Sequence, residues 1–211
     1  MVLESAGVGI GNGLREKVPV LYAAGDLDLL KLPAVAIVGS RKASDEGQRR
    51  AARLARELVR EGIAVMSGLA AGIDAAAHRA AIEHGGRTIA VIGTALDKAY
   101  PSEHAELQQL IYEKHLLLSP FRLGERTFPS AFPLRNRVMA RMARATVIVE
   151  ASDTSGSLHQ AAESIRVGHP VFIAESVVTD PTLTWPARLL GGSHAYILRN
   201  PLEVIVAAKA P

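Results

Sequence analysis

Short turns rich in glycine, serine and other small or polar residues follow four of the predicted strands. They comprise Gly39-Ser40-Arg41, the run from Ser67-Gly68 to Asp74, the run from Gly93 to Pro101, and Thr154-Ser155-Gly156-Ser157. Glycine lets backbone amides approach a phosphate closely, and serine adds a hydroxyl donor. The N-terminus of a following helix adds free N–H groups and a positive dipole end. Arg41 would add a forked, permanently charged partner, so these residue types predict anion binding.

One such turn taken alone is more often a tight connection between a strand and a helix than a binding site. Ligands of open parallel sheets bind outside the carboxyl ends of the strands, where all of these turns are expected to meet. Four turns at one edge therefore favour a shared phosphate pocket centred on Arg41. The residues alone leave open whether its ligand is a nucleotide or a nucleic-acid strand.

The chain alternates short β-branched runs with helical patterns almost from end to end. Strands are predicted over 34–38, 63–66, 88–92, 116–118, 145–149, 171–174 and 195–198. Helices are predicted over 46–61, 74–84, after Pro101, around 135–144, and over 158–167 and 201–208, with Asp74 as an N-cap. This alternation predicts an α/β fold with a doubly wound, mainly parallel sheet and helices on both faces.

The 211 residues fit a single domain. Residues 1–30 are predicted to form a loosely packed lead-in that ends in an extended piece over 18–22, and 31–211 the main domain. Residues 176–211 have no assigned role, and Trp185-Pro186 with Gly191-Gly192 predict a structured loop before the last strand.

The composition excludes several classes of site and of protein. The chain has no cysteine, which rules out disulfides, thiolate zinc sites, iron–sulfur clusters and cysteine nucleophiles. Its longest apolar runs fall far short of the roughly 20 residues that a membrane span needs, and residues 1–13 do not resemble a signal peptide. We therefore expect a cytoplasmic protein without a membrane partner.

The charge is informative through its placement, because the net value is only +3, from 24 basic and 21 acidic residues. Basic side chains crowd the stretch from Arg135 to Arg144, whereas the arginines over 49–60 are better explained as the solvated face of one helix. The chain contains no G-x-x-x-x-G-K-[ST] loop, no correctly spaced G-x-G-x-x-G, no H-E-x-x-H and no G-x-S-x-G. We accordingly expect no metal and no cofactor.

Five ordered motifs between about residues 18 and 175 resemble the DNA-processing protein A (DprA, or Smf) family. They are Val35 to Arg41, Ser67 to His78, Ile89 to Thr94 with Leu96-Asp97 and Tyr100-Pro101, Phe132 to Arg137, and Ser155 to Leu158. Leu134 stands where the family's Pro-Arg-Arg-Asn-Arg segment has an arginine.

This resemblance implies an extended Rossmann-like domain that binds single-stranded DNA in a basic pocket, without metal, nucleotide or catalysis. It also implies a role in natural transformation, delivery of the strand to the RecA recombinase, and a homodimer. By motif, Gly39, Ser40 and Arg41 would hold a phosphate, Ser67 and Gly68 would line the pocket, and Arg135, Asn136 and Arg137 would flank it. Ser155, Gly156 and Ser157 complete the set, Lys98 adds a phosphate contact, and Tyr100 either packs or stacks on a base.

The chain departs from the family at two places. His159-Gln160 replaces the usual Ile-Thr, and Glu175-Ser176 stands where a Val-Pro-Gly turn is common. No winged-helix module is recognisable after the last strand and no helical module before the first. Any task that those modules perform is therefore not expected of these residues.

Two other functions fit the same broad fold. In cytokinin-activating phosphoribohydrolases the late turn reads Pro-Gly-Gly-x-Gly-Thr-x-x-Glu, and aligning Gly156-Ser157 with it puts Gln160 in the place of the glutamate. An amide cannot act as a general base or stabilise an oxocarbenium ion by charge, although Glu163 lies one turn further on. The third candidate is a nucleotide-sensing module without catalysis.

Overall fold

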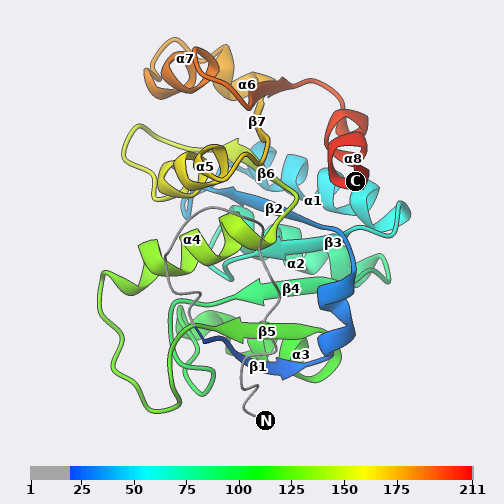
Figure 1. Cartoon of the computed structure of the whole chain (residues 1–211), viewed down its shortest axis with the longest axis vertical. Helices are drawn as coiled ribbons and strands as arrows, with labels where there is room; N and C mark the ends of the chain where they lie inside the picture. Colours follow the sequence, from blue (N-terminus) through cyan, green and yellow to red (C-terminus); the bar gives the residue numbers. More distant parts are fainter. Residues whose placement is uncertain (1–19, 211) are drawn as a thin grey trace.

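An eight-stranded sheet forms the centre of the molecule (Figure 1). The structure, a computed structural model, describes residues 20–210. Its strands are β1 (Tyr22–Gly25), β2 (Ala34–Gly39), β3 (Ala64–Ser67), β4 (Thr88–Val91), β5 (Leu116–Ser119), β6 (Ala145–Glu150), β7 (Val171–Ala174) and β8 (Ala195–Leu198). The spatial order is β1-β5-β4-β3-β2-β6-β7-β8, and only β1 runs antiparallel to its neighbour. The predicted mainly parallel, Rossmann-like α/β fold is confirmed.

Helices cover both faces of the sheet. They are α1 (Asp45–Arg60), α2 (Ile73–Glu83), α3 (Ala105–Lys114), α4 (Ala131–Met142), α5 (Ser157–Arg166), α6 (Glu175–Val178), α7 (Trp185–Leu190) and α8 (Pro201–Lys209), with 3-10 helices η1 (Leu27–Lys31) and η2 (Ser102–His104). Helices α4 and α5 lie in front of the sheet in Figure 1, and α1 and α2 lie behind it. None of the described helices is both long and apolar enough to cross a membrane.

Successive residues of the central strands supply the two cores. In β2, Val35 and Ile37 pack with α1, α2 and α8, whereas Ala36 and Val38 pack toward α4 and α5. A strand buried on both faces needs apolar residues at every position, which explains the continuous apolar runs in the sequence.

The sheet changes direction between β2 and β6. From β2 the chain adds β3, β4 and β5 on one side, and α4 then carries it back to β6 on the other side of β2. Glu150, at the end of β6, joins the two halves, because its carboxylate accepts the Ser44 hydroxyl at 2.6 Å. The Ser44 hydroxyl in turn caps α1 by accepting the Gly47 N–H at 3.0 Å. This contact fixes the loop after β2 against the end of β6, where ligands of open α/β sheets bind.

The predicted N-cap role of Asp74 is wrong. Helix α2 begins after Gly72, whose φ of +74° suits glycine, and Ile73 donates its N–H to the Ser40 carbonyl at 3.3 Å. Asp74 lies inside the first turn and accepts the N–H groups of Gly68 and Ala70. Its carboxylate therefore shapes the turn after β3 and does not cap the helix.

Near each end of the described chain, one element differs from the prediction. The edge strand β1 pairs with β5 from Tyr22 opposite Ser119, so the sheet takes a strand from within the lead-in of 1–30. The predicted extended piece over 18–22 falls partly within residues 1–19, which lie outside the described residues. Trp185-Pro186 opens helix α7 and not a loop, because proline is tolerated in the first turn of a helix.

Candidate nucleic-acid interface

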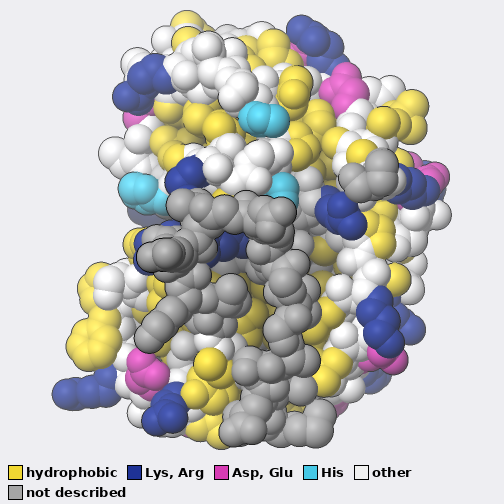
Figure 2. All heavy atoms as spheres, in the orientation of Figure 1, with side chains coloured by type: hydrophobic (Ala, Val, Ile, Leu, Met, Phe, Trp, Pro, Cys, Tyr) yellow, Lys and Arg dark blue, Asp and Glu magenta, His cyan; other side chains and the backbone are white. Residues whose placement is uncertain are grey.

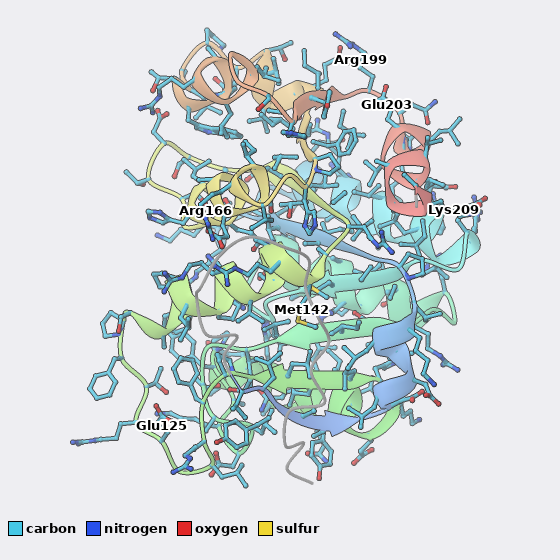
Figure 3. The ribbon with its side chains drawn as sticks, in the orientation of Figure 1. Glu125, Met142, Arg166, Arg199, Glu203 and Lys209 are labelled. Carbon is cyan, nitrogen blue, oxygen red and sulfur yellow. The ribbon has the colours of Figure 1, made fainter. Side chains whose placement is uncertain are left out.

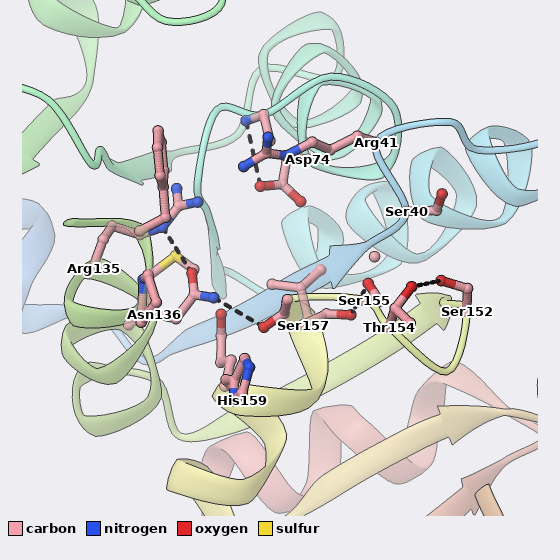
Figure 4. Close-up of a pocket in the computed structure, with 18 of the residues that line it drawn as sticks. Ser40, Arg41, Asp74, Arg135, Asn136, Ser152, Thr154, Ser155, Ser157 and His159 are labelled. Atoms are coloured by element: carbon pink, nitrogen blue, oxygen red, sulfur yellow. Dashed lines mark hydrogen bonds between the residues drawn. The ribbon is translucent and has the colours of Figure 1, made fainter. Parts of the chain in front are cut away.

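A cavity of about 610 Å³ opens at the point where the sheet changes direction. Its walls come from the turn after β2, the turn after β6, and the facing sides of α4 and α5. Figure 4 shows Arg135 and Asn136 on α4 opposite the turn that carries Ser155 and Ser157. Segments from distant parts of the sequence, around residues 38–42, 70–74 and 132–160, thus meet around one hollow of nucleotide size.

Arg41 lies at this cavity over an aromatic ring. Its guanidinium carbon is 5.3 Å from the centre of the Phe132 ring, which is within the range of a cation–π contact. The Tyr100 ring packs on Phe132 at 5.4 Å between ring centres, tilted by 44°. An exposed cation and two aromatic rings therefore form a row that leads out of the cavity, with Phe132 at its centre.

The opposite wall is the N-terminus of α5, which has no side-chain cap. The hydroxyls of Ser155 and Ser157 lie 2.8 Å apart beside it, and Asn136 donates its side-chain N–H to the Gly156 carbonyl at 3.1 Å (Figure 4). Uncapped N–H groups, hydroxyl donors and a positive dipole end are suited to a phosphate.

Arg135 forms the floor between these walls and is only 5% exposed. It donates to the carbonyls of Gly68 and Val91, the latter at 2.9 Å, and to the Asn136 side-chain oxygen at 2.8 Å. Burial lowers the pKa of Arg135, and the charge of the buried Asp74 opposes that shift. Burial likewise raises the pKa of the Asp74 carboxyl, with Arg135 and the N–H groups of Ala70 and Gly68 opposing it. Arg135 therefore links the ends of β3 and β4 to α4 beneath the cavity.

The structure brings eight of the thirteen predicted binding residues to the cavity wall: Gly39, Ser40, Arg41, Arg135, Asn136, Ser155, Gly156 and Ser157. The other five, Ser67, Gly68, Lys98, Tyr100 and Arg137, do not line it. The Tyr100 ring packs on Phe132, which lines the cavity. Lys98 and Arg137 are exposed to solvent outside it.

Ser67 and Gly68 lie beneath the cavity. The buried Ser67 hydroxyl donates to the Ile37 carbonyl at 2.6 Å, which ties β3 to β2. A Cβ at Gly68 would overlap the Arg135 guanidinium, so this glycine makes room for that side chain. The pair supports the floor of the cavity and offers no donor to its interior.

Sequence reasoning assigned no binding role to several residues that line the cavity. Among them are Phe132, Ser152, His159 and Gln160. Phe132 precedes Arg135 by three positions, which places the two on one side of α4. That spacing is the signal from which Phe132 could have been found. The sequence pointed to Gln160 only as the residue that stands in place of a catalytic glutamate.

Gln160 is fully buried in the cavity wall, and neither polar atom of its amide has a hydrogen-bond partner among the described residues. Buried polar atoms without partners cost about 1–3 kcal/mol each, whereas an apolar group of similar shape avoids that cost. We expect Gln160→Leu to raise the free energy of unfolding by about 1 kcal/mol, measured by urea denaturation. An unchanged or lower value would show that the amide has partners in solution.

Two arginines, Arg141 of α4 and Arg166 of α5, hold the Glu163 side chain. Its carboxylate accepts from Arg141 at 2.8 Å and from Arg166 at 2.7 Å, and it is 8% exposed. Arg166 is the last residue of α5 (Figure 3). The hydrogen bond from Arg166, with that from Arg141, lowers the pKa of Glu163 to about 2. A carboxylate so stabilised is a poor general base, and Glu163 does not line the cavity.

This arrangement predicts acid sensitivity. The folded-state pKa of Glu163 is lowered from 4.5 to about 2, so its contribution is complete above pH 4.5 and is lost as the pH falls toward 2. We expect wild type to lose about 3 kcal/mol of stability over that interval relative to Glu163→Gln, measured by urea denaturation at each pH. Parallel pH profiles for the two proteins would contradict the ion-pair assignment.

The described residues contain no cluster of three or more His, Asp or Glu side chains that could hold a metal ion. Hydroxyls, the guanidinium group of Arg41 and the ammonium group of Lys42 line the cavity, and these groups can bind an anion. Such groups are suited to a phosphate.

Comparison with known protein families assigns the chain. The family model for DNA recombination-mediator protein A matches residues 11–209. The chain belongs to this family. DNA processing protein DprA of Streptococcus pneumoniae is 43% identical over 161 residues, which are 76% of this chain and 57% of the relative. DprA of Bacillus subtilis is 34% identical over 172 residues, 81% of this chain and 58% of the relative. The chain thus spans somewhat more than half the length of these relatives.

Solved structures of DprA proteins share the fold. The crystal structure of S. pneumoniae DprA superposes with a TM-score of 0.81 at 39% identity, covering 89% of this chain and 66% of that one. DNA processing protein A of Helicobacter pylori, described for its mode of binding single-stranded DNA, gives 0.83 at 28% identity, covering 97% and 93%. The molybdenum cofactor carrier protein of Chlamydomonas reinhardtii gives 0.56 at 16% identity, covering 84% and 96%, a likeness of fold alone.

Proposed function

We propose that this chain binds single-stranded DNA in the cavity between β2 and β6 and acts as a non-catalytic recombination mediator. The observation that carries the proposal is the placement of the exposed Arg41 on Phe132, across the cavity from the uncapped N-terminus of α5. Binding of single-stranded DNA is described for the H. pylori protein, which matches this chain over 97% of its length.

The two sides of the cavity have complementary tasks. Arg41 holds one phosphate through its charge and its guanidinium N–H donors, with the Ser40 hydroxyl in the same wall. The turn at 155–157 offers hydroxyls and helix N–H groups for a neighbouring phosphate. Phe132 and Tyr100 present aromatic rings on which unpaired bases stack, an interaction that tolerates any base. Lys98 and Arg137 add positive charge outside the cavity.

This reading is favoured over the two alternatives by particular residues. A phosphoribohydrolase needs a carboxylate in the cavity, where this chain has Gln160, and Glu163 is engaged by arginines elsewhere. A nucleotide sensor needs only a closed pocket. The row from Arg41 through Phe132 to Tyr100 continues beyond the cavity, which suits a ligand that extends past one nucleotide.

We further propose the partners that family membership suggests: the RecA recombinase, to which the strand is delivered, and a second copy of the chain in a homodimer. The strand-binding part is the predicted domain of residues 31–211, which contains every residue of the cavity wall. The lead-in of 1–30 contributes strand β1 to the edge of its sheet.

Fluorescence anisotropy of a labelled oligo-dT at low salt tests the proposal. We expect saturable binding that unlabelled oligo-dT reverses and that an equal concentration of thymidine monophosphate does not. Competition by the mononucleotide at similar concentration would favour a sensor, and release of free base from it would favour a hydrolase. Absence of any binding at low salt would contradict the proposal.

A further inference from the structure

A second hollow of about 480 Å³ lies beside β1 and α3. Tyr22 and Tyr112 contribute aromatic rings to its wall, and Leu96 and Leu123 contribute aliphatic side chains. Tyr112 is 47% exposed and Leu123 is 63% exposed, so this hollow is open to solvent. An exposed cavity walled by aromatic and aliphatic side chains is unusual on a protein surface unless it receives a ligand.

The wall of this hollow also contains an unused hydrogen-bond acceptor. Gln108 is 6% exposed, and its side-chain nitrogen donates to the Leu96 carbonyl at 3.1 Å. Its side-chain oxygen is buried and has no partner among the described residues. Each of the four nucleobases carries an N–H or amino donor on its pairing edge that such an oxygen can accept when the base is unpaired.

One loop links the wall of the hollow to the wall of the first cavity. Leu96, Asp97 and Ala99 line the second hollow, and the next residue, Tyr100, packs on Phe132 in the wall of the first cavity. Lys98 is exposed between them. A strand that leaves the first cavity over Phe132 and Tyr100 therefore reaches the second hollow across a loop that carries a cation.

Acidic and basic side chains both lie around the hollow, so it lacks the excess of positive charge found at the first cavity. Arg122 donates to the Tyr22 hydroxyl at 3.1 Å, while Asp97 lies in the wall and Glu125 accepts the Arg122 backbone N–H at 2.9 Å. Glu125 lies on the loop that extends beside the lower end of the sheet (Figure 3). Basic side chains in Figure 2 form separate small groups across the front face, several beside acidic ones. The hollow thus offers aromatic rings without an excess of positive charge, which suits a base and not a phosphate.

We propose that the hollow between β1 and α3 is a second base-binding subsite for the same DNA strand, with Tyr112 as its stacking platform. The inference rests on the proposed function and extends it from one bound nucleotide to a path of several. A subsite of this kind makes affinity depend on oligonucleotide length, because only a longer strand reaches both cavities.

The test compares an oligo-dT of about 4 nucleotides with one of about 12, a range that single-strand-binding domains cover. We expect Tyr112→Ala to bind the short oligonucleotide as wild type does and the long one about 5- to 100-fold more weakly, because loss of one stacking platform has that effect. Tyr196→Ala is the matched control. Tyr196 is 49% exposed on β8, at the opposite edge of the sheet from β1, and its truncation should change neither affinity.

Leu123→Ala probes the same hollow from an exposed loop and should weaken only the long oligonucleotide, without any change to helix α3. Equal affinities of wild type, Tyr112→Ala and Leu123→Ala for the long oligonucleotide would overturn the second subsite, with the proposed function intact. A wild-type chain that binds neither oligonucleotide would overturn the proposed function itself, and this inference with it.

Discussion

Arg41→Ala is expected to weaken the binding of a labelled oligo-dT by about 10- to 100-fold, because a charge-assisted hydrogen bond to phosphate contributes about 1.5–3 kcal/mol. The side chain is exposed and its described contact is with the Phe132 ring, so its loss should leave the fold intact. The measurement is a pair of anisotropy titrations at one salt concentration, with thermal unfolding of both proteins to verify the fold.

A control of equal charge separates a specific contact from the general field of the protein. Arg79 is exposed on α2 and does not line the cavity, so Arg79→Ala removes the same charge from another place. We expect its affinity to fall by less than about 2-fold, since Arg79 makes no direct contact in the cavity and salt screens interactions between exposed charges. Equal losses for the two variants would show that Arg41 contributes only net charge.

Arg135→Leu is expected to destabilise the fold by about 3–5 kcal/mol, because removing one partner of a buried charged network leaves the others uncompensated. The carbonyls of Gly68 and Val91 would lose their donor, and the Asp74 carboxylate would lose the opposing charge of Arg135. Urea denaturation gives this difference directly.

The pH dependence identifies the cause of that loss. Without Arg135 the pKa of Asp74 rises further, and a carboxyl with a raised folded-state pKa favours folding in its protonated form. The deficit of Arg135→Leu should therefore grow as the pH is raised above the usual Asp range. Arg137→Ala, two positions along α4 but exposed, should change stability by less than about 0.5 kcal/mol. A pH-independent deficit would argue for simple loss of packing.

The sheet was predictable from the sequence because its strands are buried on both faces. Runs such as Val35 to Val38 leave few alternatives, and the glycines that follow them mark the turns. The antiparallel edge strand β1 was harder to predict from the sequence. Only four residues, Tyr22–Gly25, carry it, and its pairing with β5 depends on contacts across almost a hundred positions.

The sequence predicted which residues gather at the candidate site better than it predicted what each of them does there. The turns after β2 and β6 meet as the strand order requires, which brings Arg41 opposite Ser155. Sequence could not show that Arg135 is buried, since its neighbour Arg137 has the same chemistry on the exposed side of the helix. Nor could it place Tyr100 on Phe132, a contact between a loop and the start of helix α4 that no periodic pattern links.

The salt dependence of oligo-dT binding, measured for wild type and for Arg41→Ala, tests most directly whether Arg41 holds a phosphate of a single strand. Each neutralised phosphate contributes about −0.7 to the slope of log K against log salt concentration for single strands. We predict a steep negative slope for wild type and a slope shallower by about 0.7 for Arg41→Ala. A wild-type slope near zero, or identical slopes for the two proteins, would contradict the account.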